Sequence, residues 1–233
     1  QRVAPTMRLM SVKPGYAHPC GKRFGATERR TMILWTSQEE AVYNELLKTG
    51  VYRCDFNLSS MRDCRKQYDW LVQQMKRRIG PPPDKVTYPV WAIYQQDGKH
   101  RKPDLRRERW AFGCNGERFA CLEIEILDRE VLLSDLDVWC IILNDGLLSD
   151  TEQEDRFLEA QYEALSPSEK RRMKEKNWER VFDLSPLNND WMRRGYDIQA
   201  TFWELRLEQV RDVRFFRAAA KFDPPPSDTD IVR

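Results

Sequence analysis

The sequence predicts a single α+β domain with a mixed or antiparallel sheet and flanking helices. Three observations indicate this class: apolar residues make up 41% of the 233-residue chain, aromatic residues make up 11%, and short β-forming runs alternate with helical periodicities. Such a content is typical of a chain with a sizeable core. No apolar run approaches the ~18–20 residues of a membrane span, so we expect no membrane-spanning helix and no membrane partner.

Residues 1–31 differ from the remainder of the chain. They carry seven Lys or Arg and one acidic residue, and they show neither a helical nor an alternating period. We expect a disordered or extension segment here, the alternative being a basic arm that contacts a polyanion. The single domain is expected to occupy 32–221, and the polar residues 222–233, which include three consecutive prolines, are expected to form a disordered tail.

Charge and cysteine usage restrict the function classes. Without residues 1–31 the chain holds 32 basic and 36 acidic residues, a mild acidity that argues against broad binding to a phosphate backbone. None of the six cysteines is spaced C-x-x-C, and only His18 and His100 offer imidazole, so a structural zinc site is not expected. Scattered cysteines without an apolar secretory segment are typical of reduced thiols in a cytoplasmic protein.

The first predicted elements are a strand and a helix. Met32–Thr36 is a short apolar run typical of a buried strand, and Ser37 with Glu40 forms the pattern of a capping box that would begin a helix. Gly50 stands where a helix ends, and Val51–Arg53 is expected to be extended.

The middle of the chain predicts a second helix and a hairpin. Apolar residues recur at three and four positions from Met61 to Ile79, and the Gly-Pro-Pro-Pro that follows ends the helix. The run Val86–Tyr94 alternates as a strand does, although Pro89 indicates an edge or irregular strand. The Asp97-Gly98 dipeptide is a hairpin signal.

The second half alternates strands and helices. Ser166 and Glu169 form a capping box with Pro at the first helical position, which predicts a helix that begins there. The remaining predicted elements are a polar loop at His100–Glu108, strands at Phe119–Leu127, Glu130–Ser134, Ile198–Leu205 and Val210–Phe216, and helices at Asp135–Leu143 and Thr151–Leu165.

No strong catalytic motif is present, because P-loop, dinucleotide-binding, zinc-protease and serine-hydrolase patterns are all absent. Glu123 and Glu125 are two residues apart on one predicted strand and therefore share a face, as a pair dividing acid and base roles would. A third interpretation is a metal-dependent nuclease that uses these two residues together with Asp104 and Asp135, although the spacing of the four carboxylates matches no recognisable motif. A solvated strand face is the simpler alternative.

Two basic runs could bind phosphate groups. They are Arg101–Arg107, which contains Pro103 and Asp104, and Lys170–Lys176 on a predicted helix. For each run, a solvated or salt-paired surface explains the charges as well.

Several stretches together resemble an uncharacterised bacterial family known only as a domain of unknown function. They include MILWTSQEEAVYNELLKTGVYRCD, YPVWAIYQQDGK, NWERVFDL and IQATFWELRLEQVRDVRFF, and the resemblance runs from about Met32 to Phe216. The order of elements also resembles, more distantly, the ADP-ribosyltransferase superfamily, which includes DNA-modifying toxins of toxin–antitoxin systems. That superfamily begins with a strand and a helix ending in Gly, and it finishes with a Glu-bearing strand and a V-x-x-V-x-x-F strand.

The second resemblance implies an NAD-binding cleft. Trp35 and Thr36 stand where the superfamily places a His or Arg that holds the nicotinamide ribose, and Arg53 would contact a phosphate. Gln199 stands at the position of the catalytic Glu, yet an amide cannot act as a base. Either another carboxylate serves, with Glu125, Glu130 and Glu204 as candidates, or transferase activity has been lost.

The resemblance therefore implies an NAD-binding, ADP-ribosyltransferase-like protein of the bacterial toxin or defence type. The rival interpretation is a non-catalytic module that binds a protein or nucleic acid through its two basic runs. The sequence does not define the oligomeric state.

Overall fold

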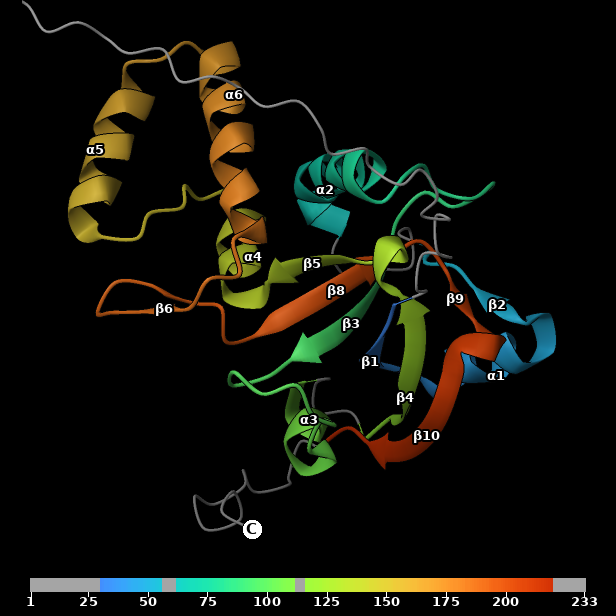
Figure 1. Cartoon of the computed structure of the whole chain (residues 1–233). Helices are drawn as coiled ribbons and strands as arrows, with labels where there is room; N and C mark the ends of the chain where they lie inside the picture. The colour runs from blue at the N-terminus through green and yellow to red at the C-terminus, as the bar shows by residue number, and fades with distance from the viewer. Residues whose placement is uncertain (1–29, 56–61, 112–115, 220–233) are drawn as a thin grey trace, which may run out of the picture.

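The structure, a computed structural model, describes residues 30–55, 62–111 and 116–219 (Figure 1). Its centre is a six-stranded, fully antiparallel sheet in the order β10-β4-β1-β3-β8-β5. The single α+β domain is therefore confirmed, and of the two predicted sheet types the antiparallel one is present. Residues 1–29 and 220–233 lie outside the described residues, as does Met61; they include the whole predicted tail and all but two residues of the predicted extension, and Thr31 belongs to the first strand instead.

The strands of the sheet come from the whole length of the described chain. They are β1 (Thr31–Glu39), β3 (Val90–Gln95), β4 (Arg118–Leu127), β5 (Leu132–Asp135), β8 (Ile198–Phe202) and β10 (Val210–Arg217). Two small antiparallel pairs join β2 (Val51–Tyr52) to β9 (Leu205–Arg206) and β6 (Leu187–Asn188) to β7 (Arg193–Arg194). The sheet is strongly twisted, since β5 and β8 run across the view of Figure 1 while β4 runs up it.

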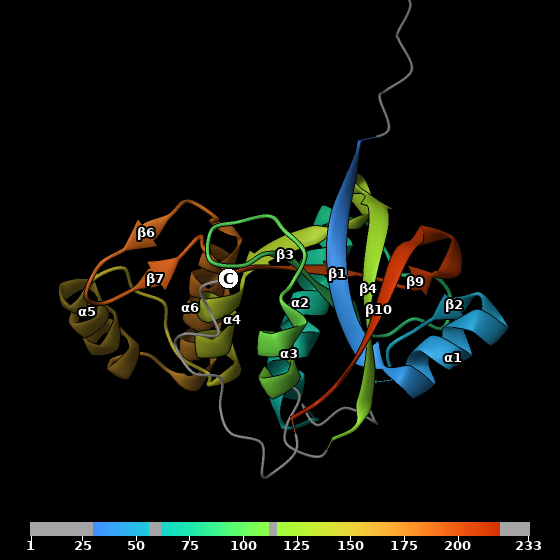
Figure 2. The same ribbon diagram turned by 90° about the horizontal axis from the view of Figure 1, so that it is seen from below.

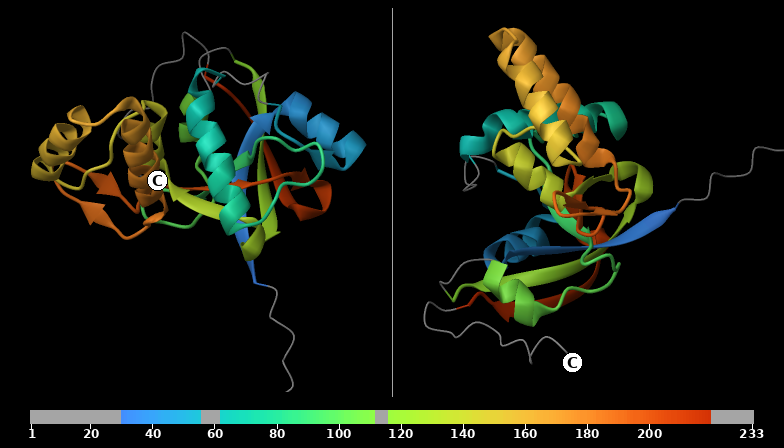
Figure 3. Two further views of the ribbon diagram at one scale, coloured as in Figure 1. Left: turned by 90° about the horizontal axis from the view of Figure 1, so that it is seen from above. Right: turned by 90° about the vertical axis from the view of Figure 1, so that its left-hand side faces the viewer.

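Helices flank this sheet on several sides. They are α1 (Glu40–Thr49), α2 (Arg65–Arg78), α3 (Leu105–Ala111), α4 (Leu136–Leu143), α5 (Glu152–Glu163) and α6 (Pro167–Asn177), with a 3-10 helix η4 (Trp178–Phe182) directly after α6. Seen from below, α1 lies at one end of the molecule and α4, α5 and α6 lie at the other (Figure 2). Helices α5 and α6 lie side by side and project together from the sheet (Figure 3).

Side chains alternate between two apolar clusters because successive strand residues face opposite sides. In β3, Val90 and Ala92 join the cluster that Leu46 of α1 covers, whereas Trp91 joins the cluster built by α2, α4 and η4. The cluster that contains Trp91 is rich in aromatic contacts, and the Trp91 ring lies 5.4 Å from that of Trp139 of α4. The face covered by α2 and α4 is the one on which the candidate site lies.

The first strand and helix differ from their predicted bounds. The strand β1 continues to Glu39 because it pairs with β4 at every residue from Thr31 to Glu39, and Ser37 lies opposite Cys121 in that ladder. The predicted capping box of Ser37 and Glu40 was therefore wrong: α1 begins at Glu40 without a side-chain cap. Gly50 ends α1 in the left-handed conformation, at φ 75°, as predicted.

Two further expectations are corrected in the middle of the chain. Strand β3 is central rather than an edge, but it is irregular, as the alternative predicted, with a register shift between Ile93 and Gln95; Pro89 immediately precedes its first residue, Val90. The polar loop predicted at His100–Glu108 contains the start of α3, which Asp104 precedes and whose Arg106 amide donates to the Asp104 carboxylate. The Asp97-Gly98 turn is confirmed, with both residues at positive φ.

Most later elements follow the sequence, but the predicted strand Ile198–Leu205 is divided into β8 and β9, and the predicted strand Glu130–Ser134 begins only at Leu132. The capping box of Ser166 and Glu169 begins α6, and Asp135 caps α4 by accepting a hydrogen bond from the Val138 amide. Strand β10 covers the predicted Val210–Phe216 run with one more residue. Within the described ranges, no helix combines the length and the apolar character that crossing a membrane requires.

Candidate functional site

A cleft of about 300 Å³ opens at the middle of the sheet, where β1, β3 and β8 lie side by side. Its wall includes Trp35 and Thr36 of β1, Trp91 and Ile93 of β3, and Gln199 of β8. Pro103, Glu108 of α3 and Leu136 of α4 close the other sides. The wall thus consists of apolar surfaces with a few polar groups, which is the composition of a small-molecule site.

The register of the sheet explains why residues so distant in the sequence meet here. Trp35 pairs with Ile93, Ile93 pairs with Gln199, and Gln199 pairs with Ser134. Directly paired residues of neighbouring strands point to the same face, so these side chains form one row across the sheet. Glu123 of β4 extends the row on the far side of Trp35.

Trp35 is held in a single orientation by polar and aromatic contacts. Its indole Nε1 donates to Glu123 Oε2 at 3.1 Å, and its ring lies 5.0 Å from that of His100, which stacks on Tyr94. The Lys102 ammonium forms an ion pair with the same Glu123 oxygen at 3.0 Å. The Trp35 ring, only 5% exposed, is therefore a rigid wall of the cleft.

Thr36 lines the cleft with a hydroxyl group that is already engaged. Its Oγ1 donates to the Trp91 carbonyl at 2.7 Å and accepts a hydrogen bond from Gln38 Nε2 at 2.7 Å. Thr36 therefore ties β1 to β3 and fixes the Gln38 side chain at the edge of the cleft.

Gln199 is almost wholly buried, with 3% of its surface exposed. Its Nε2 donates to Ser134 Oγ at 3.2 Å, and none of the described residues donates a hydrogen bond to its Oε1. The amide oxygen can therefore accept a hydrogen bond from a ligand hydroxyl, but it cannot take up a proton as a base would.

Glu108 is the carboxylate of the cleft that the sequence analysis missed. It lies on α3, lines the cleft, and accepts a hydrogen bond from Gln96 Nε2 at 2.9 Å. The signal that could have identified it is Asp104, a residue type that favours the start of a helix and that stands just before Leu105–Ala111. In a helix, Glu108 would project in a different direction from the arginines next to it in the sequence.

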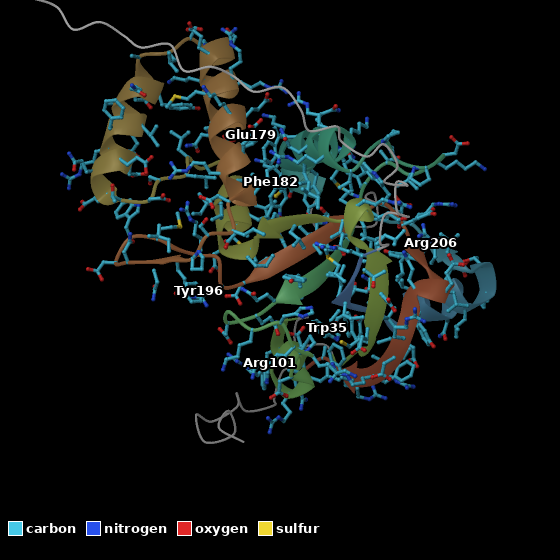
Figure 4. The ribbon with its side chains drawn as sticks, viewed as in Figure 1. Trp35, Arg101, Glu179, Phe182, Tyr196 and Arg206 are labelled. Carbon is cyan, nitrogen blue, oxygen red and sulfur yellow. The ribbon has the colours of Figure 1, made fainter. Side chains whose placement is uncertain are left out.

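A polar recess of about 280 Å³ adjoins the cleft and shares Gln96, Glu108 and Leu136 with it. Arg101 and Arg107 line this recess. Arg107 forms an ion pair with Asp97, whereas Arg101 pairs with no carboxylate in the described part of the chain. Figure 4 shows Arg101 beside α3, on the same side of the sheet as Trp35. The recess is thus lined by two arginines and four carboxylates, and Arg101 is the cation there that could bind an anionic group.

The acidic side of the recess is largely occupied by internal pairs. Asp104 binds Arg106 at 2.6 Å, and this contact lowers the pKa of the Asp104 carboxyl. Asp197 binds Arg193 and accepts from the Asp97 amide. Glu108, the remaining carboxylate of the recess, accepts from the neutral Gln96 amide, so an anion would be favoured on the Arg101 side of the recess and away from Glu108.

The structure does not bring the other predicted site residues to the cleft. Arg53 follows β2 and pairs with Glu204 at 2.9 Å, near the α1 end of the molecule. Glu130 binds Arg206 at 2.9 Å, and Figure 4 shows Arg206 on that same side. Glu125 accepts hydrogen bonds from Thr31 and Arg211, which lower its pKa. None of these groups lines the cleft or its recess.

The carboxylates of the nuclease reading are likewise dispersed. Glu123 and Glu125 do share a face of β4, as predicted, but Glu123 is bound to Trp35 and Lys102. Asp135 is buried at the start of α4, and Asp104 is bound to Arg106. Over the described ranges, no group of three or more His, Cys, Asp or Glu side chains is arranged to hold a metal ion.

Comparison with known proteins identifies the family. A family model described as a domain of unknown function, DUF3841, matches residues 33–211, which is most of the chain. No curated protein and no solved structure matches it. The matched range contains β3, β8 and all but the first two residues of β1, and therefore every strand residue that lines the cleft. The chain belongs to the DUF3841 family of domains of unknown function.

Proposed function

We propose that the cleft binds NAD and that the protein is an ADP-ribosyltransferase-like member of its family. One observation carries the proposal: Trp35, Thr36 and Gln199, which the sequence resemblance implied as ligand-binding positions, line the same cleft. Their strands lie in the centre of the sheet, separated by β3 alone. A role of the bacterial toxin or defence type is the part of this proposal that rests on the resemblance alone.

The residues present fit the chemistry of a dinucleotide. Trp91, which is partly exposed on the cleft wall, offers apolar ring surface for a flat heterocycle, and the Gln199 amide oxygen can accept a hydrogen bond from a ribose hydroxyl. Arg101, unpaired in the described part of the chain, lies at the mouth, where it can bind a phosphate. In this arrangement Arg101 takes the phosphate-binding role that the sequence assigned to Arg53.

Transfer of ADP-ribose needs negative charge beside the ribose as the nicotinamide leaves, and Gln199 supplies none. Glu108 is the carboxylate on the cleft wall, and it lies on α3 rather than on β8. We therefore propose tight binding of NAD with slow release of nicotinamide. Replacing Gln199 by Glu should raise that release if the amide occupies the position of the missing acid.

Thermal unfolding with and without NAD tests the binding. At a hundredfold excess over Kd, a ligand that binds only the native state stabilises it by ~2.7 kcal/mol. For a chain of this size we expect a rise in Tm of roughly 5–10 °C. Gln199→Ala and Arg101→Gln should abolish most of this shift, while the ligand-free variants remain folded by circular dichroism.

Matched controls lie outside the cleft. Gln153→Ala and Arg156→Gln replace the same residue types on the exposed surface of α5 and should keep the full shift. No shift with millimolar NAD, or equal shifts in the cleft and control variants, would refute the proposal. Nicotinamide release from Gln199→Glu no faster than from the parent would refute the assignment of that position.

A further inference from the structure

A second concave site lies between α2 and α6, away from the cleft. It is a groove of about 560 Å³, and we call it the cationic groove. Its floor is Trp70, whose ring stacks on Phe182 at 5.9 Å and packs edge-on against Trp178 at 5.5 Å. Figure 4 shows Glu179 and Phe182 on the side of η4 that faces α2. These aromatic contacts fix the two helices relative to each other, so the groove is a preformed feature.

The groove is lined by more cations than carboxylates. Five cations and three carboxylates line it: Glu175 pairs with Arg171 at 2.7 Å, Asp69 accepts from the Tyr88 hydroxyl, and Glu179 is exposed. Within the described ranges no ion pair or hydrogen bond reaches the side chains of four further lining residues, all of them exposed. They are Lys66 and Arg77 of α2 and Arg172 and Lys176 of α6.

Several arginines elsewhere on the surface are held by carboxylates. Arg180, Arg193 and Arg194 each form ion pairs with two or more carboxylates. Like charges gathered on two facing helices repel one another and lower stability, which an anionic ligand would relieve. The groove therefore has the electrostatic character of a binding site.

The placement of the four cations selects a chain-like polyanion. Arg172 and Lys176 are one turn apart, about 6 Å along α6, and Lys66 and Arg77 are about 16 Å apart along α2. A ligand must carry repeated negative charges to contact both walls. The groove is concave, so a single strand can enter it, whereas a duplex would contact only its rim.

The lining also indicates which part of such a ligand is contacted. Trp70 is buried beneath the charged side chains, and no exposed aromatic ring among the lining residues offers a platform for stacking a base. An acidic protein partner would need apolar or aromatic anchors, which the groove lacks. Affinity must therefore come from release of the counterions that surround a dense polyanion.

We propose that the cationic groove binds the sugar–phosphate backbone of a single-stranded nucleic acid, without reading its sequence. The four unpaired cations contact phosphates. The groove shares no lining residue with the proposed NAD cleft, so this proposal can be tested independently of the proposed function.

Fluorescence anisotropy with the full chain and a labelled 12-nucleotide strand tests the proposal, using single-stranded DNA and RNA of mixed sequence. For four phosphate contacts, the slope of log K against log salt concentration should be about −2.8, at about −0.7 per contact. The double variant Arg172→Gln with Lys176→Gln should reduce the slope by about 1.4 and weaken binding on the order of 20-fold at 0.1 M salt.

The matched control is Lys48→Gln with Arg129→Gln. It removes two exposed cations that are likewise unpaired in the described part of the chain but lie outside the groove, and it should bind as the parent does. The groove variant should also unfold at a temperature no lower than the parent, because repulsion is relieved. This separates loss of binding from loss of folding.

Several results would overturn the proposal. One is equal binding by the groove and control variants, and another is a salt slope near zero. Tighter binding of the corresponding duplex would assign the surface to double-stranded nucleic acid instead. Displacement of the strand by polyglutamate at equal charge concentration would assign it to an acidic protein partner.

Discussion

Gly195 shows how a single backbone position supports the part of the sheet near the cleft. Its amide donates to Asp135 Oδ2, and its carbonyl accepts from Gln95 Nε2 at 3.0 Å. Its φ is +78°, and a Cβ atom there would lie 2.7 Å from the Pro186 Cα and 2.9 Å from the Leu184 carbonyl oxygen. Both contacts are with backbone, so no side-chain rearrangement can relieve them.

We therefore predict that Gly195→Ala destabilises the protein strongly. Positive φ costs a non-glycine residue about 1–3 kcal/mol, and the forced contacts add about 1–3 kcal/mol. Gly80→Ala is the matched control, because Gly80 has φ +91° but open space around a Cβ. Urea unfolding should show a smaller loss for Gly80→Ala. Equal losses would mean that the loop at Pro186 yields easily.

The α5–α6 hairpin depends on polar contacts, because neither helix contains a buried residue. Arg180 binds Glu154 at 2.7 Å and Asp150 at 2.9 Å, and Arg194 binds Asp150 at 3.0 Å. The hydrogen bond from Arg180 lowers the pKa of Glu154 below its usual value near 4.5. This ion-pair network connects the start of α5 to η4 and to β7.

The lowered pKa of Glu154 predicts a pH dependence of stability. A carboxyl group whose pKa is lower in the folded state stabilises that state above its unfolded pKa, near 4.5. This stabilisation is lost as the pH falls through the lower pKa that the carboxyl group has in the folded state. The parent should therefore exceed Glu154→Gln in unfolding free energy at pH 6, and the difference should shrink toward pH 3. Glu159→Gln, an exposed change on the same helix, should show no such convergence.

Hydrogen exchange should distinguish the helices of this domain. Helix α2 buries seven of its residues, including Leu71 and Met75, whereas α5 buries none. Local opening needs less free energy where few apolar contacts are broken. Amides of α5 should therefore exchange well before those of α2 under native conditions. Simultaneous exchange of both helices would show that the hairpin unfolds only with the whole domain.

At the scale of the whole molecule, the two proposed sites are built on different parts of the framework. The cleft is formed mainly by β1, β3 and β8, and the cationic groove by α2 and α6 with η4. Their separate linings predict independent binding. The groove variant Arg172→Gln with Lys176→Gln should keep the full NAD-dependent rise in Tm, and Gln199→Ala should keep oligonucleotide affinity. A change of more than about threefold in the dissociation constant for NAD or for the oligonucleotide would show that the two sites are coupled.

Net charge does not reveal where unpaired cations gather. The mild acidity of the chain after residue 31 argued against broad binding to phosphate backbones, and the acidic residues are indeed spread through many ion pairs. The unpaired cations become apparent only when α2 and α6 are placed side by side. Lys66 and Arg77 lie about one hundred residues before Arg172 in the sequence, so no local pattern connects them.

The sequence by itself determined the class of the fold and the elements whose signals are local. Caps and turns such as Gly50, Asp97-Gly98 and the Ser166–Glu169 box depend on neighbouring residues, and the structure contains all three. The apolar stripe of α2 and the strand runs of β4 and β10 are local in the same sense.

Tertiary structure alone decided which residues meet. Pairing with β4 extends β1 through Ser37, against the local capping pattern, because the interstrand hydrogen bonds outweigh a single cap. The same register places Trp35 and Gln199 in one row, but it leaves Arg53 paired with Glu204 elsewhere. Strand pairing joins residues more than one hundred positions apart, and the free energy that fixes it comes from contacts that no local stretch of sequence contains.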